Sequence, residues 1–128
     1  MAILIGLMAI SVPAHAGDGA LQWRTIETRH FRITFPVGLE RLGNRAAELC
    51  EEAHEIMGAL MNYAPRERIE VSVTDFGDSA NGSATALPYP RISLLAAPPK
   101  LDSNLNDYDD WFRLLIFHEY LHILQLDQ

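Results

Sequence analysis

The segment His118-Glu119-Tyr120-Leu121-His122 holds the residues of this 128-residue chain whose types and spacing most directly indicate chemistry. It has the H-E-x-x-H pattern. On a helix, residues four apart lie one above the other, so both imidazoles can bind one cation, at about 2.0–2.1 Å for zinc. Glu119 lies on the same side, rotated by about 60°, and can take a proton from a metal-bound water. The spacing therefore predicts His118 and His122 as zinc ligands and Glu119 as the general base of a hydrolase.

A second interpretation of this segment is structural. The two histidines would be core residues that donate hydrogen bonds to backbone carbonyls, and Glu119 would point to solvent. A chain of this composition contains the pattern by chance with a probability of roughly 1%, so the metal site is favoured.

A zinc site of this class needs a third protein ligand, which the sequence does not identify. The longer metzincin pattern requires glycine at position 125 and histidine at 128, where this chain has Gln125 and Gln128, so that class is excluded. Asp75, Asp78 and Asp102 are candidates in principle, but aspartate in turn-rich segments usually caps or shapes the turn. The other alternative is a Glu on a later helix. We expect that ligand beyond Gln128, with this chain as the N-terminal part of a longer protein.

The helix that would position the motif begins around Asn106-Asp107, which can cap its N-terminus. At about 100° per residue, one stripe of this helix carries Trp111, Leu114, Leu115, His118, Leu121, His122 and Gln125. The other side carries Phe112, Ile116, Tyr120, Ile123 and Leu124. A helix that is apolar nearly all round is typical of one buried between two layers, so we expect both histidines and Glu119 in the interior.

Upstream, the sequence predicts three strands and one long helix. Apolar and polar residues alternate at 31–35 and 69–74, which is the period of half-buried strands. Between them, apolar positions from Leu39 to Leu60 recur every three or four residues, which indicates an amphipathic helix. Residues 75–83 are turn-rich, and Arg91–Leu95, flanked by prolines, is predicted as an edge strand. This order of elements indicates an α+β fold.

Two other reactive residue types have structural interpretations. Cys50 follows Leu49 on the long helix, and Glu51 and Glu52 oppose thiolate formation, so a buried and unreactive cysteine is predicted. His54 is expected to be a surface or capping histidine.

The composition restricts the class of protein further. The chain has 48% hydrophobic residues and is short enough for one small globular domain. Its net charge of −7 argues against a nucleic-acid binder, which needs clustered Lys and Arg. No apolar run reaches the length of about 20 residues that spans a bilayer.

Residues 1–16 have the features of a cleaved secretory signal. They contain no acidic or basic residue, and the apolar stretch Ile3–Val12 is followed by Pro13 and by Ala14-His15-Ala16, which resembles a signal-peptidase site. The alternative is a buried N-terminal strand, which the lack of a Lys or Arg before Ile3 favours. We predict an exported protein, periplasmic or extracellular, with its mature domain at residues 17–128.

These residues together resemble a known family. The peptidase-MA-like module, which precedes a TolB-like β-propeller in exported bacterial proteins, is similar to this chain at His30-Phe31, the long helix, Asp78–Thr85, Pro88, Ile92-Ser93-Leu94, Asp109-Asp110-Trp111 and His118–Leu124. The resemblance covers about residues 23 to 128. Its most specific parts are Ala80–Thr85 and the histidine helix.

The resemblance implies a zincin-like α+β fold with a small mixed sheet, a long helix and a buried H-E-x-x-H helix, of the gluzincin kind in which a Glu on a following helix completes the zinc site. It implies His118 and His122 as ligands, Glu119 as the base, a peptide or protein substrate and a C-terminal β-propeller. Relatives have Thr at the position of Leu121 and His at that of Gln125. Neither difference removes a ligand or the base, but Gln125 lies on the metal-facing stripe and could change how a ligand is oriented.

The strand at Arg91–Leu95 carries a further expectation. In zincins an edge strand above the active-site helix pairs with the extended substrate, so Ile92, Ser93 and Leu94 are predicted to bind a peptide through the main chain. The alternative is an edge strand that the flanking prolines protect from pairing.

Three functions remain open from the sequence. The leading hypothesis is an exported zinc metallopeptidase. The second is a zincin-like domain without turnover that has a binding or scaffold role beside the propeller. The third is a metal hydrolase that acts on another bond, which the same ligands would serve.

The predicted signal has a direct test. N-terminal sequencing of the exported protein should begin at Gly17, because signal peptidase cuts after a small residue such as Ala16. An exported chain that still begins at Met1 would contradict the signal.

Overall fold

A computed structural model describes residues 21–75, 81–96 and 105–128 of the chain. Within these ranges, five strands and two helices follow in the order β1 (Trp23–Glu27), β2 (Phe31–Pro36), α1 (Glu40–Met61), β3 (Ile69–Thr74), β4 (Asn81–Thr85), β5 (Arg91–Leu95) and α2 (Leu105–Leu126). The predicted signal at residues 1–16 lies outside the described residues.

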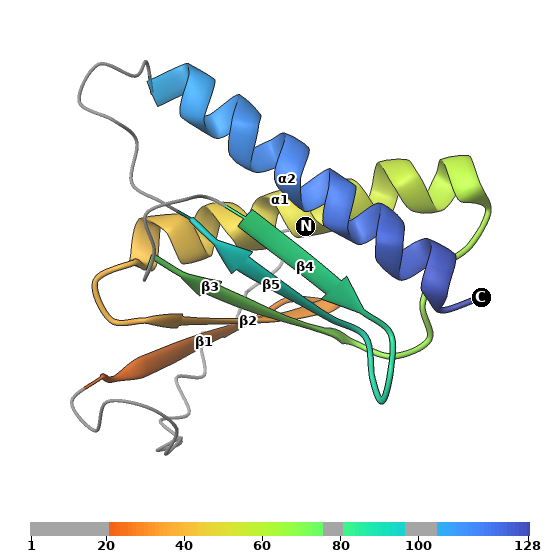
Figure 1. Cartoon of the computed structure of the whole chain (residues 1–128), viewed down its shortest axis with the longest axis horizontal. Helices are drawn as coiled ribbons and strands as arrows, with labels where there is room; N and C mark the ends of the chain where they lie inside the picture. The colour runs from red at the N-terminus through yellow and green to blue at the C-terminus, as the bar shows by residue number, and fades with distance from the viewer. Residues whose placement is uncertain (1–20, 76–80, 97–104) are drawn as a thin grey trace, which may run out of the picture.

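The strands form one mixed sheet in the order β1-β2-β3-β5-β4. The central strands β2, β3 and β5 are parallel, and β1 and β4 pair antiparallel at the two ends of the sheet. α1 is the crossover that a parallel β2–β3 pair requires. It packs against β2, while α2 packs against β4 and against α1 (Figure 1). The predicted α+β class is confirmed.

The core lies between the sheet and the two helices. Because successive side chains of a strand point to opposite faces, β2, β3 and β5 each turn every second residue toward the helices. The buried hydrophobic residues are Phe31, Ile33, Phe35, Ala46, Ala47, Leu49, Cys50, Ala53, Ile69, Val71, Val73, Ile92, Leu94, Ala96, Phe112, Ile116, Tyr120, Ile123 and Leu124.

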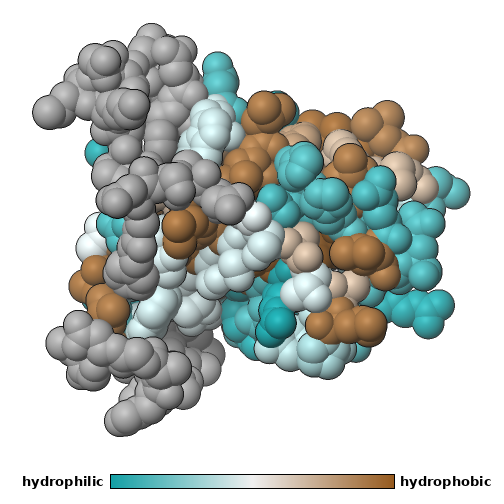
Figure 2. Space-filling model, in the orientation of Figure 1, coloured by the Kyte–Doolittle hydropathy of each residue, from teal (hydrophilic) through white to brown (hydrophobic). Residues whose placement is uncertain are grey.

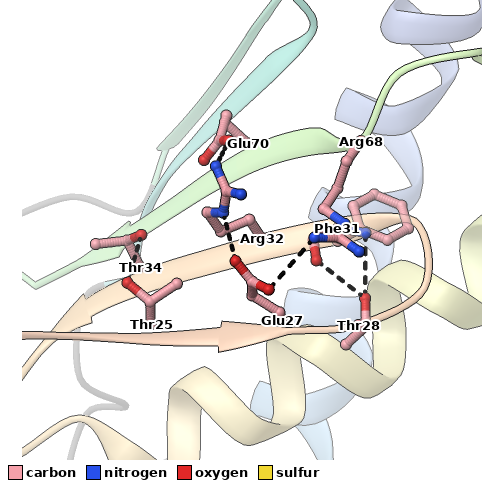
Figure 3. Close-up of polar contacts among 8 residues, drawn as sticks. All are labelled: Thr25, Glu27, Thr28, Phe31, Arg32, Thr34, Arg68 and Glu70. Carbon is pink, nitrogen blue, oxygen red and sulfur yellow. Dashed lines mark hydrogen bonds and ion pairs between the residues drawn. The ribbon is translucent and has the colours of Figure 1, made fainter. Parts of the chain in front are cut away.

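The other face of the sheet is polar. Arg32 on β2 contacts Glu27 on β1 at 2.9 Å and Glu70 on β3 at 2.7 Å, and Arg68 lies 3.4 Å from Glu27 (Figure 3). Charges of opposite sign thus alternate across neighbouring strands, which suits a face in contact with solvent. Among the described residues, no helix covers this face.

Two predictions about the strands are wrong. β5 is not an edge strand, because β3 pairs with it on one side and β4 on the other. Its main chain therefore has no free edge for a peptide, and the substrate-binding role predicted for Ile92, Ser93 and Leu94 loses its basis. β4 lies partly in the segment predicted as turns. The sequence did not indicate this strand, because Gly82 and Ser83 have low strand propensity. It forms by pairing with β5, with Ser83 opposite Ser93.

α2 is not buried on all sides by the described residues. Its buried hydrophobic side consists of Phe112, Ile116, Tyr120, Ile123 and Leu124. On the histidine side, Leu114 is 72% exposed and His118 is exposed as well. Figure 2 shows hydrophobic residues in several separate patches on the face seen in Figure 1. The prediction that a second layer covers α2 is therefore wrong for the part of the chain described.

Neither helix in the described ranges is long and apolar enough to span a membrane.

Gly43 on α1 lies directly over the ring of Phe35 on β2. A Cβ at this position would lie 2.8 Å from Cζ of that ring. Alanine for glycine inside a helix ordinarily stabilises by about 0.5–1 kcal/mol, whereas overpacking a core costs about 1–3 kcal/mol. We expect Gly43→Ala to lower the free energy of unfolding by about 1 kcal/mol in urea denaturation. Its exposed neighbour Asn44 is the control, and equal stabilisation by Gly43→Ala and Asn44→Ala would contradict the contact.

Candidate metal centre

The ring nitrogens of His118 and His122 lie close together beside α2. Their Nε2 atoms are 3.1 Å apart, and the two rings are nearly perpendicular, at 89°. Two nitrogens that bind one zinc ion tetrahedrally at about 2.0–2.1 Å lie about 3.3–3.4 Å apart. The observed separation is close to that of two ligands of one ion and slightly shorter. The same separation also allows one neutral ring to donate a hydrogen bond to the other.

Glu119 and the two histidines differ in their exposure. His118 is exposed, His122 is half-buried, and Glu119 is only 5% exposed. The structural interpretation of the motif, with core histidines and a solvent-facing Glu119, is wrong on both points. The prediction of an interior position is confirmed for Glu119 and wrong for His118.

Glu119 lies against the backbone of Gly82 in β4. A Cβ built on Gly82 would be 2.8 Å from Oε1 and 2.9 Å from Cγ of Glu119. A residue with a side chain does not fit at such distances unless the Glu119 side chain or one of the two elements shifts. The terminal strand of the sheet and the predicted base are thus in direct contact, and Gly82 makes the contact possible.

The described residues do not supply a third ligand. No group of three His, Cys, Asp or Glu side chains among them is placed to hold a metal ion. Asp75 is an exposed residue that follows β3, while Asp78 and Asp102 lie outside the described residues. The expectation of a ligand beyond Gln128 stays a prediction.

A polar cluster links α1 to the buried side of α2. The Tyr120 hydroxyl and Nδ1 of His54 are 2.8 Å apart, and the His54 ring stacks on His30 with centroids 3.7 Å apart. Glu51 accepts a hydrogen bond from the backbone N–H of His30 at 2.9 Å and contacts its Nδ1 at 2.7 Å. His54 is therefore not the surface or capping residue predicted. Since 66 positions separate His54 from Tyr120, no local pattern could have indicated this cluster.

The electrostatics of the cluster favour one set of protonation states. Burial lowers the pKa of His54, and the nearby His30 lowers it further. A neutral His54 can accept a hydrogen bond from Tyr120, whose own pKa is raised by burial. Although burial alone would raise the pKa of Glu51, hydrogen bonds from His30 and Thr28 hold it below its usual value. At neutral pH His54 is thus neutral and shares a hydrogen bond with the Tyr120 hydroxyl, and Glu51 carries a negative charge.

Two further features of the described residues lie apart from the histidine pair. Cys50 is buried in the core, as predicted, and burial raises the pKa of its thiol. A hollow of about 730 Å³ is lined by residues that include Ser72, Ser83 and Arg91. These three side chains belong to the polar face of the sheet, opposite α2, so this hollow is not part of the candidate centre.

Comparison with known proteins identifies no family for this chain. No family model matches it, and no curated protein matches it. The functional argument therefore depends on the geometry of the described residues.

The contact between Gly82 and Glu119 predicts an energetic coupling. Gly82→Ala should lower the free energy of unfolding by about 1–3 kcal/mol, because the new methyl group collides with the carboxylate side chain. In a Glu119→Ala background the same change should cost less than about 0.5 kcal/mol, since the collision partner is gone. A double-mutant cycle in urea denaturation measures both costs. Equal costs in the two backgrounds would show that Gly82 does not act through Glu119.

Proposed function

We propose that this chain is the N-terminal part of an exported zinc metallopeptidase, in which His118 and His122 hold zinc and Glu119 is the general base. The proposal includes a zincin-like, peptidase-MA-like domain, a signal at residues 1–16 and a β-propeller in the full-length protein. The observation that carries it is the approach of two Nε2 atoms to 3.1 Å on a helix that also bears a buried carboxylate.

The positions of these three residues suit their proposed roles. The histidine pair faces solvent on one side, which leaves room for a further ligand and for substrate. Glu119 is shielded from bulk water and held against β4 by its contact with Gly82. A carboxylate in a fixed position can accept a proton from one reacting group and give it to another.

In the proposed reaction, the metal and the residues of the chain have separate roles. Zinc, when bound, supplies a Lewis acid that acidifies water and polarises a substrate carbonyl. His118 and His122 hold the ion. Glu119 accepts a proton from the attacking water at its carboxylate and donates it to the amine that leaves as the peptide C–N bond breaks.

We assign the substrate to the outer edge of β4 rather than to β5. Among the described residues β4 is the terminal strand of the sheet. It pairs with β5 along one side and contacts Glu119 through Gly82. An extended peptide can add to such an edge through main-chain hydrogen bonds. The scissile bond would then lie next to the base and the histidines.

Zinc content is the first test. Full-length protein should hold one zinc per chain by elemental mass spectrometry after excess metal is removed. His118→Ala and His122→Ala should each lose it, because a site with one fewer ligand binds zinc weakly. Wild-type protein that takes up no zinc would contradict the proposal as a whole.

Glu119→Gln separates an enzyme from a binding domain. It should keep the zinc but reduce hydrolysis of fluorescent casein by about 10²–10⁴-fold, because it removes the general base. Glu55→Gln on the exposed side of α1 is the matched control and should change neither property. The described residues offer two candidate metal ligands, His118 and His122, rather than three. A zinc-loaded wild type that hydrolyses no casein would therefore favour the alternative, a zincin-like binding or scaffold domain.

A further inference from the structure

Polar contacts follow one side of α2 along its whole length and connect it to α1 and to the segment after α1. Each contact joins a group in or directly after α2 to a partner that lies between 61 and 66 positions earlier in the chain, so none is a local contact. The pairs, with their shortest distances, are Arg45–Asp109 at 2.6 Å, Glu52–Arg113 at 2.6 Å, His54–Tyr120 at 2.8 Å and Tyr63–Asp127 at 2.7 Å.

These contacts share one direction around the helix axis. At 100° per residue, Asp109 and Arg113 lie within about 20° of Tyr120. Asp127 follows the end of α2 and keeps the same direction, since its backbone N–H still donates to the carbonyl of Ile123. His118 and His122 lie at about 160° from Tyr120 on either side, and Glu119 at about 100°. The row of contacts is therefore diametrically opposite the histidine pair, and Glu119 is turned toward β4.

Tyr120 is the member of this row that lies within the motif. Its side chain is 0% exposed, and its ring packs against Phe31 and His54 at centroid distances of 5.9 and 6.0 Å. His54 is in turn stacked on His30, which Glu51 binds through two atoms. The partner of the Tyr120 hydroxyl is thus itself held in place by two neighbours.

The geometry points to Tyr120 as a positioning residue for the metal centre. Together with the buried side of the helix, its hydrogen bond to His54 holds the rotation of α2 and, through it, the direction in which His118 and His122 project. The inference rests on the proposed function for its biological meaning. The effect on the two imidazoles does not require a bound metal.

The cluster around Tyr120 is not arranged as a second metal centre. The rings of His30 and His54 are stacked with an interplanar angle of 19°, whereas those of His118 and His122 are nearly perpendicular, and the lone pairs of two stacked rings lie in nearly parallel planes. The Nδ1 atom of His30 is engaged by Glu51, and that of His54 by Tyr120. Its contacts connect α1 to α2, which is what a positioning role requires.

Two variants each remove one partner of the hydrogen bond between Tyr120 and His54. Tyr120→Phe keeps the ring in the core and removes the hydroxyl, and His54→Ala removes its partner. In metal-free protein, both should shift the imidazole signals of His118 and His122 in nitrogen–proton NMR spectra. In zinc titrations with a chromophoric chelator as competitor, both should raise the dissociation constant about three- to tenfold.

The controls separate positioning from loss of stability. Gly43→Ala, expected to destabilise α1 at Phe35, should change neither the imidazole signals nor the zinc affinity. The double variant of Tyr120 and His54 should weaken zinc binding no more than the stronger single variant, because both changes remove the same bond. If Tyr120→Phe does not fold, His54→Ala at its half-buried position carries the test.

The outcomes distinguish this inference from the proposed function. Unchanged imidazole signals in the single variants, or additive losses of affinity in the double variant, would overturn the role of Tyr120. Equal shifts in Gly43→Ala would also overturn it, since general destabilisation would then explain the effect. A wild type that binds no zinc would overturn the proposed function, while the metal-free spectra would still decide the role of Tyr120.

Discussion

The burial of one side of α2 is the interaction on which the rest of this structure depends. Phe112, Ile116 and Tyr120 lie in the core on that side. Because a helix completes a turn in about 3.6 residues, burying them also decides where the motif points. The histidines, half a turn away, face outward, and Glu119, about a quarter turn away, meets the terminal strand. Hydrophobic burial has no preferred direction, whereas the polar pairs with α1 match one rotation of the helix and oppose others.

The value of those pairs lies more in geometry than in stability. Arg45–Asp109 and Glu52–Arg113 are partly exposed to solvent, and ion pairs of that kind contribute about 0–1 kcal/mol each. Because they lie at successive positions along α2, they nevertheless oppose rotation of the helix about its axis. Tyr120 adds a hydrogen bond within the H-E-x-x-H segment itself, where the hydrophobic core shields the tyrosine from solvent. A weakly stabilising set of contacts can in this way hold a helix in one orientation.

Much of the fold could be predicted wherever a single element produces its own pattern. The strand at 69–74 agrees with β3, and the helix expected from Leu39 to Leu60 differs from α1 by one residue at each end, because both have a strict apolar period. β1 and β4 do not have such a period. β4 contains Gly82 and Ser83, which have little strand propensity, and it forms by pairing with β5. The prolines that flank Arg91–Leu95 predict an edge strand there, but β4 pairs along its outer side and takes the terminal position.

The sequence by itself determined the chemistry that α2 carries: two imidazoles one turn apart and a carboxylate next to them, because helical spacing is a local property. Only the tertiary structure decided that the histidines face outward, that Glu119 lies against Gly82, and that Tyr120 meets His54. Each of these depends on which distant residues fill the other sides of the helix. Local spacing specifies the angles between side chains on one helix, but the direction of the whole set is specified by contacts between segments far apart in the chain.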